Sequence, residues 1–265
     1  MTKKIYLLMI AVFFYCTATA QKKVLFVMSA AQELELKKGK TYKTGVFLSE
    51  FYLAYKDIVQ AGYEVEFATP EGIKPTIDKE SYHKKYWSGR DSLITEAASF
   101  IQENEKFNHP RKLAEIVHHI WSYSGLVIPG GQGLMADLIK DKNIPALLMA
   151  FSDTGKPIGL ICHAPALLLS MPKVENPFTG YCVSAVTALE ELFIETFVIK
   201  GKPVIRKIGK QLKKAGLKYK KGRPAGNFAI RDRELITSQN PYSSMAFGKL
   251  YLEALNEYQT QKTPR

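Results

Sequence analysis

The chain has 265 residues, 46% of them hydrophobic and 23% charged, and these proportions exclude a disordered, collagen-like or disulfide-dense small protein. Thirty-seven Lys and Arg residues against 25 Asp and Glu residues give a net charge of +12, which suits an anionic partner without selecting its class. Eleven of the basic residues lie between Lys200 and Arg223. No recognisable nucleic-acid-binding motif accompanies them, so we expect a solvated surface there and no nucleic-acid partner. The alternative is that this segment tethers the protein to an anionic envelope surface.

Residues 1–20 resemble a secretory signal peptide. Two lysines precede an apolar run over residues 5–15, and Ala18-Thr19-Ala20 supplies the small residues that signal peptidase reads. The run is too short for a membrane span, and the bulky residues before Cys16 are unlike a lipoprotein cleavage site. We therefore expect an exported, periplasmic protein whose mature chain, residues 21–265, has no integral membrane segment; an unprocessed chain would stay cytoplasmic.

The mature chain opens with a strand, a helix and a second strand. Lys23–Ser29 is β-branched and aromatic, as in a buried strand, and Thr44–Gly62 carries apolar residues at helical spacing. Tyr63–Thr69 alternates apolar and polar residues, which predicts a second strand. Two strands joined by a crossover helix indicate a parallel sheet with helices on its faces.

More units of the same kind follow. Further strands are expected at Gly125–Pro129, Pro157–Ile161 and Glu234–Thr237, and further helices at Ile144–Thr154, Ala164–Ser170 and Ser243–Tyr258. The pattern predicts an α/β fold with a doubly wound, mostly parallel sheet. Residues 71–108 do not follow the pattern and are too many for a simple connection, so we interpret them as an inserted lid over the carboxyl edge of the sheet.

Cys162 is the residue best placed for chemistry. An apolar strand runs directly into it and a helix is expected to begin directly after it, so its thiol should project from the sheet edge beside backbone N–H groups, where a helix N-terminus favours the thiolate. The adjacent His163 could add a second donor or a general base. A disulfide with Cys182 would consume this thiol, so we expect both cysteines to be free. The alternative for Cys162 is a small, buried apolar residue.

Three short motifs occur in one order along the chain: TGVFLSE at residues 44–50, PGGQG at 129–133 and ICHAP at 161–165. Together they resemble the ThiJ/PfpI superfamily, whose fold is flavodoxin-like, of the class I glutamine amidotransferase type. The segment LITSQNPYSSMAFGKL near the end is similar to the larger members, the heat-shock chaperones and glutathione-independent glyoxalases (glyoxalase III). The resemblance covers residues 23–258.

The resemblance implies roles for individual residues. Cys162 matches the family nucleophile, His163 its partner, and Glu50 the acidic residue that approaches the sulfur in relatives. A carboxyl beside a thiolate should be protonated, with a raised pKa that fits acid/base work. Gly130 and Gly131 match the glycines whose backbone N–H groups can stabilise an oxyanion. The next residue, Gln132, stands where many larger relatives have His, and its amide can form hydrogen bonds but cannot transfer a proton.

A third, acidic member of a Cys–His–acid set would orient the imidazole. The segment GYCVSAVTALEE at residues 180–191 resembles the acid-containing loop of the family, and we place Glu191 in this role with Glu190 as the alternative. Either residue could instead be an exposed residue in the first turn of a helix.

No cofactor or metal is expected. The chain has no dinucleotide fingerprint, no phosphate loop and no CxxC pair. Glu115 and His118 have a spacing that holds a metal only where a second such pair faces it, and no second pair is visible.

The resemblance implies a cofactor-free, cysteine-dependent enzyme for a small carbonyl substrate. A glyoxalase III-like lyase would convert methylglyoxal to lactate without glutathione, and a deglycase would act on the corresponding adducts. The alternatives are an amidase or peptidase of the same superfamily, and a holdase chaperone or redox sensor. Relatives are commonly dimers, so a homodimer is expected.

Overall fold

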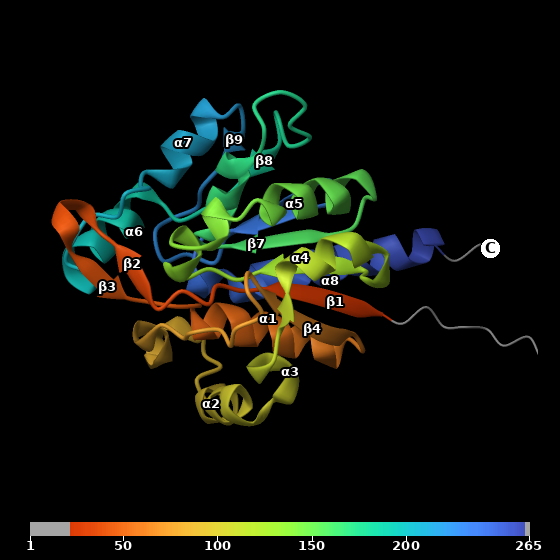
Figure 1. Cartoon of the computed structure of the whole chain (residues 1–265), viewed down its shortest axis with the longest axis horizontal. Helices are drawn as coiled ribbons and strands as arrows, with labels where there is room; N and C mark the ends of the chain where they lie inside the picture. Colours follow the sequence, from red (N-terminus) through yellow and green to blue (C-terminus); the bar gives the residue numbers. More distant parts are fainter. Residues whose placement is uncertain (1–21, 263–265) are drawn as a thin grey trace, which may run out of the picture.

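A seven-stranded sheet in the order β10-β11-β7-β6-β1-β4-β5 forms the centre of the computed structural model, which describes residues 22–262 (Figure 1). The strands are β1 (Lys23–Val27), β4 (Glu64–Thr69), β5 (Arg111–Lys112), β6 (Gly125–Ile128), β7 (Ile158–Ile161), β10 (Ala229–Asp232) and β11 (Leu235–Ser238). All neighbours pair in parallel except β10, which is antiparallel to β11. The predicted signal peptide lies outside the described residues.

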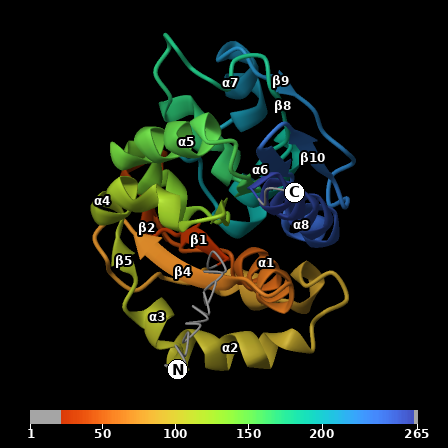
Figure 2. The ribbon, with the colours of Figure 1, turned by 90° about the vertical axis from the view of Figure 1, so that its right-hand side faces the viewer.

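Helices cover both faces of the sheet. On one face α1 (Leu48–Gln60) contacts α8 (Ser244–Lys262), and on the other lie α4 (Leu113–Ile116) and α5 (Asn143–Asp153), as Figure 2 shows. Because both faces are covered, the central strands are buried along their whole length, which explains their continuous apolar runs. The predicted doubly wound, mostly parallel α/β fold is confirmed. No helix within residues 22–262 is long and apolar enough to cross a bilayer.

Two predicted helices differ in detail. The helix expected from Thr44 begins at Leu48, because the residues before it are extended: Val46 bridges Ile77, and the Phe47 N–H donates to the Gly130 carbonyl at 3.0 Å. This later start puts Glu50 in the first turn of α1. The segment Ala164–Ser170 is a 3-10 helix rather than an α-helix.

The segment that we interpreted as a lid has two parts. Residues 78–86, which include two short 3-10 helices at Lys79–Tyr82 and Lys84–Tyr86, reach the carboxyl edge of the sheet and line a cavity there. The later part forms α2 (Leu93–Glu103) and α3 (Glu105–Asn108). It packs beside α1 through Phe100 and Phe107, whose ring centroids lie 6.0 and 5.3 Å from that of Phe51. Only the first part therefore has a position from which it can cover a site.

Smaller elements complete the fold outside the main sheet. They are the β2–β3 hairpin (Glu33–Glu35 and Thr41–Lys43), the parallel pair β8 and β9 (Cys182–Val183 and Lys218–Tyr219), α6 (Ala188–Phe193), the π-helical turn η8 (Ile194–Val198) and α7 (Ile208–Lys214). α6 continues directly into η8. Both follow β8, which contacts β10. The segment between β8 and α6 reaches the carboxyl edge of the sheet, where the Val186 N–H donates to the Cys162 carbonyl.

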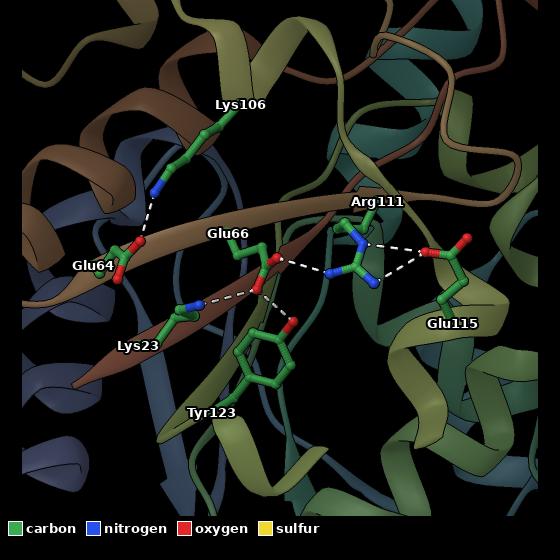
Figure 3. A network of polar contacts seen from close by, with 7 residues as sticks. All are labelled: Lys23, Glu64, Glu66, Lys106, Arg111, Glu115 and Tyr123. Atoms are coloured by element: carbon green, nitrogen blue, oxygen red, sulfur yellow. Dashed lines mark hydrogen bonds and ion pairs between the residues drawn. The ribbon is translucent and has the colours of Figure 1, made fainter. Parts of the chain in front are cut away.

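A polar network supports the β4–β5 side of the sheet (Figure 3). The Glu66 carboxylate on β4 accepts a hydrogen bond from the Tyr123 hydroxyl at 2.7 Å and lies 3.4 Å from both Lys23 Nζ and an Arg111 nitrogen. Arg111 also pairs with Glu115 at 3.1 Å. The network joins β1, β4 and the two-residue strand β5, whose backbone pairing alone is short.

Candidate active site

The motif residues meet at the carboxyl edge of the sheet. Cys162 follows β7, the turn containing Gly130 and Gly131 follows the neighbouring strand β6, and Glu50 lies in the first turn of α1. Since the carboxyl ends of parallel strands lie at one edge, residues that are far apart in sequence come together there.

Cys162 has a strained backbone, with φ of 59° in the left-handed region. Its N–H donates to the Ser238 carbonyl at 2.8 Å, and its own carbonyl accepts from the Val186 N–H at 3.0 Å. These two hydrogen bonds hold a sharp strand-to-helix turn of the kind that presents a nucleophile. Ser238 belongs to the motif quoted near the end of the chain, so this motif has a structural role that the sequence did not reveal.

His163 lies between the sulfur and Gln132. Its Nδ1 is 3.2 Å from Cys162 Sγ, and its Nε2 is 2.9 Å from Gln132 Nε2. Burial lowers the pKa of His163 to about 4, so the imidazole is neutral near pH 7. The partner of Nε2, the ring nitrogen that points away from the sulfur, is the Gln132 amide and not a carboxylate.

Glu50 is buried beside the cysteine, with 3% of its surface exposed. Its Oε2 accepts a hydrogen bond from the Gly130 N–H at 3.0 Å. Burial raises the pKa of Glu50 to about 8, against the opposing effects of the Cys162 thiol and the Gly130 N–H. The carboxyl is consequently protonated near neutral pH, as the family resemblance implies, and it can change its charge close to physiological pH.

Cys162 rests as a thiol rather than as the predicted thiolate. Burial raises its pKa well above the ordinary value, and the nearby carboxyl groups of Glu50 and Glu190 act in the same direction. The helix that was expected to stabilise a thiolate is a 3-10 helix of seven residues. Cys162 and Cys182 are both free, as expected.

Gly130 and Gly131 are both required at their positions, for different reasons. The Gly130 N–H is taken by Glu50, so it is not available to the predicted oxyanion, and a Cβ atom there would lie 2.4 Å from Glu50 Oε2 and 2.9 Å from Cys162 Cβ. Gly131 has φ of 108°, and a Cβ atom on it would lie 2.3 Å from the Gly45 carbonyl oxygen. Gly130 is thus required by close packing, whereas Gly131 is required also by its backbone conformation.

The structure does not bring Glu191 to His163. The Glu191 side chain turns away from the cysteine and accepts a hydrogen bond from the Ile208 N–H at 3.3 Å, at the start of α7. Its neighbour Glu190 lines the cavity instead, with one oxygen accepting from Asn240 Nδ2 at 2.7 Å and from the Ala225 N–H at 2.8 Å. The sequence could not separate the two, because the rotation of α6 decides which one faces the site.

The site opens into a cavity of about 440 Å³. Cys162, His163, Glu50, Gly131 and Gln132 form its base. The residues 78–86 contribute Asp78, Glu80, Lys85 and Tyr86 to the wall, and the rest of the wall is largely apolar: Phe47, Val186, Leu189, Phe193, Ile194, Val198, Ile199 and Tyr242. The sequence did not single out these wall residues; the Tyr-rich stretch before Trp87 was the one available signal. Within residues 22–262, no group of three or more His, Cys, Asp or Glu side chains is placed to hold a metal ion.

Comparison with known proteins places the chain among relatives. Residues 41–254 match the DJ-1/PfpI family. The chain belongs to the DJ-1/PfpI family. This confirms the resemblance that the three motifs indicated.

Among the curated members of the DJ-1/PfpI family, the chain is similar to the protein/nucleic acid deglycase HchA of Escherichia coli O139:H28 (strain E24377A / ETEC), with 27% identity over 232 residues, 86% of this chain and 79% of that protein. Among solved structures, glyoxalase III from Candida albicans has a TM-score of 0.72 at 23% identity and covers 89% of this chain and 98% of its own. The Rapid Encystment Protein of Francisella tularensis has a TM-score of 0.72 at 22% identity, covering 88% and 99%. These two structures support the family fold.

Proposed function

We propose that this protein is a cofactor-free, cysteine-dependent enzyme that converts α-oxoaldehydes such as methylglyoxal into 2-hydroxy acids without glutathione. The observation that carries the proposal is the position of the Cys162 thiol, between the His163 imidazole at 3.2 Å and the buried carboxyl of Glu50, at the base of a largely apolar cavity. The names of the similar proteins, a deglycase and a glyoxalase III, support the same substrate class.

The first step is addition of the thiol to the aldehyde. Cys162 Sγ forms a bond to the aldehyde carbon, and the C=O π electrons move to oxygen. The thiol proton passes to the neutral His163 imidazole and on to this oxygen, which yields a hemithioacetal. A neutral imidazole with an unprotonated ring nitrogen can accept this proton, whereas an imidazolium could not.

The second step is an internal proton transfer. The Glu50 carboxylate takes the proton from the former aldehyde carbon, the electron pair forms a carbon–carbon double bond, and the ketone oxygen receives the proton, which gives an enediol. Glu50 then takes the hydroxyl proton from the sulfur-bearing carbon and delivers it to the neighbouring carbon, which gives the thioester of lactate. Water then cleaves the carbon–sulfur bond and releases lactate and the Cys162 thiol. The sum is methylglyoxal plus water giving lactate, so no external oxidant or reductant is needed.

The size of the cavity favours a second candidate, the removal of oxoaldehyde adducts from larger molecules. A volume of about 440 Å³ lies in the range of about 300–1,000 Å³ that is common for drug-sized ligands, far above the needs of a triose-sized molecule. The same cysteine would attack the same carbon of a methylglyoxal adduct, and the amine would leave. Release of free amine from methylglyoxal-treated N-acetyl-lysine, faster than the uncatalysed decay, would distinguish this activity.

The experiment that tests the proposal follows methylglyoxal loss and lactate formation without glutathione. Cys162→Ala and Glu50→Gln should abolish both signals. Cys182→Ser is the matched control, because this second free cysteine lies outside the cavity and should leave turnover unchanged. Full turnover by Cys162→Ala would refute the proposed chemistry.

We also propose that residues 1–20 direct export and that the mature protein is a homodimer. N-terminal sequencing of protein recovered from the periplasm should begin at Gln21. Sedimentation equilibrium should give twice the mass of one mature chain. An intact N-terminus in cytoplasmic protein would contradict the first expectation, and a monomer mass would contradict the second.

A further inference from the structure

The helical segment formed by α6 and η8 is amphipathic in the opposite sense from an ordinary surface helix. Four of its large apolar side chains are exposed, and two of its acidic side chains are buried. Glu191 and Glu195 have only 8% and 7% of their surface exposed. The exposed apolar side chains, which we call the apolar ridge, are Leu189 at 62%, Leu192 at 56%, Phe193 at 50% and Phe197 at 65%. Large apolar side chains gathered on one exposed face indicate a binding surface.

The inward acids hold the ridge in this orientation. Glu195 forms a bidentate ion pair with Arg206, in which Glu195 Oε1 lies 2.6 Å from Arg206 Nε. Glu191 accepts a hydrogen bond from the Ile208 backbone. Rotating the helix to bury the ridge would break both interactions and expose two anchored carboxyl groups. The phenyl rings of Phe193 and Phe197 lie 5.1 Å apart and form one continuous apolar surface.

Basic grooves border the ridge on two sides. One groove is lined by Phe193 and Phe197 together with Lys79, Lys85 and Lys200. The other is lined by Leu192 together with Arg206, Lys207, Lys210, Lys213 and Lys221. Much of the basic segment between Lys200 and Arg223 is therefore arranged around the ridge.

Most of this positive charge is not compensated. The acidic residues of the grooves are Glu80, which pairs with Lys85 at 3.0 Å, and the two inward acids of the helix. In the described part of the chain, none of the other groove lysines takes part in an ion pair: Lys79, Lys200, Lys207, Lys210, Lys213 and Lys221. The surface thus combines an apolar centre with a positively charged surround.

We propose that this surface binds the interface of an anionic lipid bilayer, with the apolar ridge inserted among the acyl chains and the groove lysines against the headgroups. Apolar insertion and attraction to anionic headgroups are the two contributions that hold interfacial helices on membranes. The proposal does not depend on the catalytic activity.

Other occupants match the surface less well. A second copy packed by a two-fold axis would bring the same lysines of both chains into proximity, which is electrostatically unfavourable. A nucleic acid would satisfy the lysines but would leave the aliphatic side chains of Leu189 and Leu192 without an apolar partner. Because Leu189 and Phe193 also line the cavity of the candidate active site, binding in this way would hold the cavity mouth at the membrane surface.

Tryptophan fluorescence of the full chain tests the contact locally. The chain has two tryptophans: Trp87 is fully buried, and Trp121 is 67% exposed in the segment before β6, near the amino edge of the sheet and so opposite the ridge. The double variant Trp121→Phe/Phe193→Trp places the exposed reporter on the ridge, and the wild-type chain is its matched control. Both contain the same residues 1–20, so any lipid binding by that segment is common to them.

With vesicles of phosphatidylglycerol and brominated phosphatidylcholine, the ridge tryptophan should shift to shorter wavelength and lose about half of its emission, whereas Trp121 should not change. Replacing Lys207, Lys210 and Lys213 by Glu should raise the lipid concentration for half-binding about tenfold or more. Added salt should raise it as well. A ridge tryptophan that is not quenched, although the protein sediments with the vesicles, would overturn the proposal. If the emission of the ridge tryptophan shifts to shorter wavelength without lipid and the shift grows with protein concentration, self-association replaces the proposal. If the emission shifts only when an unfolded client protein is added, client binding replaces it.

Discussion

Gln132 and His163 face each other at the base of the cavity, with 2.9 Å between their Nε2 atoms, while the other ring nitrogen of His163 faces the Cys162 sulfur. The amide therefore selects the tautomer of the imidazole. When its nitrogen donates to Nε2, the ring proton lies on Nδ1; when the amide turns and its oxygen accepts from Nε2, Nδ1 is free to take the thiol proton.

Removing this amide should slow the reaction. Gln132→Leu leaves both tautomers available, and we expect kcat/KM for methylglyoxal to fall about tenfold, as for other groups that orient a histidine through its second nitrogen. Gln132→Glu presents only acceptor oxygens, so it should favour the productive tautomer and match or exceed the wild-type rate. Equal rates in all three proteins would show that the amide does not set the tautomer.

The pH dependence of the rate should follow the pair formed by Glu50 and Cys162. Both groups are protonated near neutrality, since burial raises the pKa of Glu50 to about 8 and that of Cys162 still further. The reactive pair must lose one proton, so kcat/KM should rise with pH through about 8 and then level off. Initial rates measured from roughly pH 5.5 to 9.5, on both sides of that pKa, test this rise in kcat/KM. A rate that falls over the same interval would exclude the proposed use of the pair.

Glu50 should also make stability depend on pH. Its ordinary pKa of 4.5 applies to the unfolded chain and the raised value of about 8 to the folded one. Between these values the folded protein holds a proton that the unfolded chain has released, so the free energy of unfolding falls as pH rises and the loss is complete above about 8. Since Gln is uncharged and can still accept from the Gly130 N–H, Glu50→Gln should remove this loss.

Urea unfolding of wild type and Glu50→Gln at a series of pH values measures the difference. The variant should become more stable than the wild type by a few kcal/mol as pH rises to 8.5, because one unit of pKa corresponds to about 1.4 kcal/mol. The contribution of His163 has the opposite sign. Burial lowers its pKa to about 4, so the free energy of unfolding rises with pH from that value to the ordinary value of 6.5 and this contribution does not change above it. A difference between the two proteins that does not change with pH would contradict the buried position of the carboxyl.

The sequence predicted the sheet and the nucleophile because both depend on local patterns. Continuous apolar runs identified β1, β6 and β7, and the strand that leads directly into Cys162 placed the thiol at the sheet edge. The antiparallel edge strand β10 was missed, since its residues are half-buried and lack such a run.

What the sequence could not predict depends on contacts between distant residues. The left-handed backbone of Cys162 is held by Ser238 and Val186, and neither contact has a local signal. The choice between Glu190 and Glu191 depends on a helix that turns its acidic residues inward, the reverse of the usual pattern on which sequence reasoning relies.

The two neighbouring glutamates should respond differently to neutralisation. The negative charge of Glu190 is one cause of the raised pKa of Glu50, so Glu190→Gln should move the rise of kcat/KM to lower pH. Glu191→Gln should leave that profile in place, because Glu191 contacts the start of α7 and not the cavity. The Glu191→Gln variant should instead have a higher free energy of unfolding than the wild type above pH 7. Burial raises the pKa of Glu191 to about 7, so the wild type loses stability as pH rises to that value and the variant does not. A shifted rate profile in Glu191→Gln alone would restore the role that the sequence suggested for it.

Gly130→Ala tests whether the close approach of strand, thiol and carboxyl is needed for activity. The new Cβ atom would lie 2.4 Å from Glu50 Oε2, 2.7 Å from the Ile161 carbonyl and 2.9 Å from Cys162 Cβ, so the carboxyl and the thiol must separate. Because small displacements of reacting groups can lower rates about a hundredfold, we expect at least that loss in kcat.

Gly155→Ala is the matched control for this variant. Gly155 has φ of 62° and no atom within 4 Å of an added Cβ, so alanine there imposes backbone strain of about 1–2 kcal/mol without crowding any neighbour. The control should therefore lower the free energy of unfolding by that amount and keep full kcat. If Gly130→Ala remains folded and active, the hydrogen bond from the Gly130 N–H to Glu50 is not what positions the carboxyl, and proton transfer by Glu50 would have to tolerate a displaced side chain.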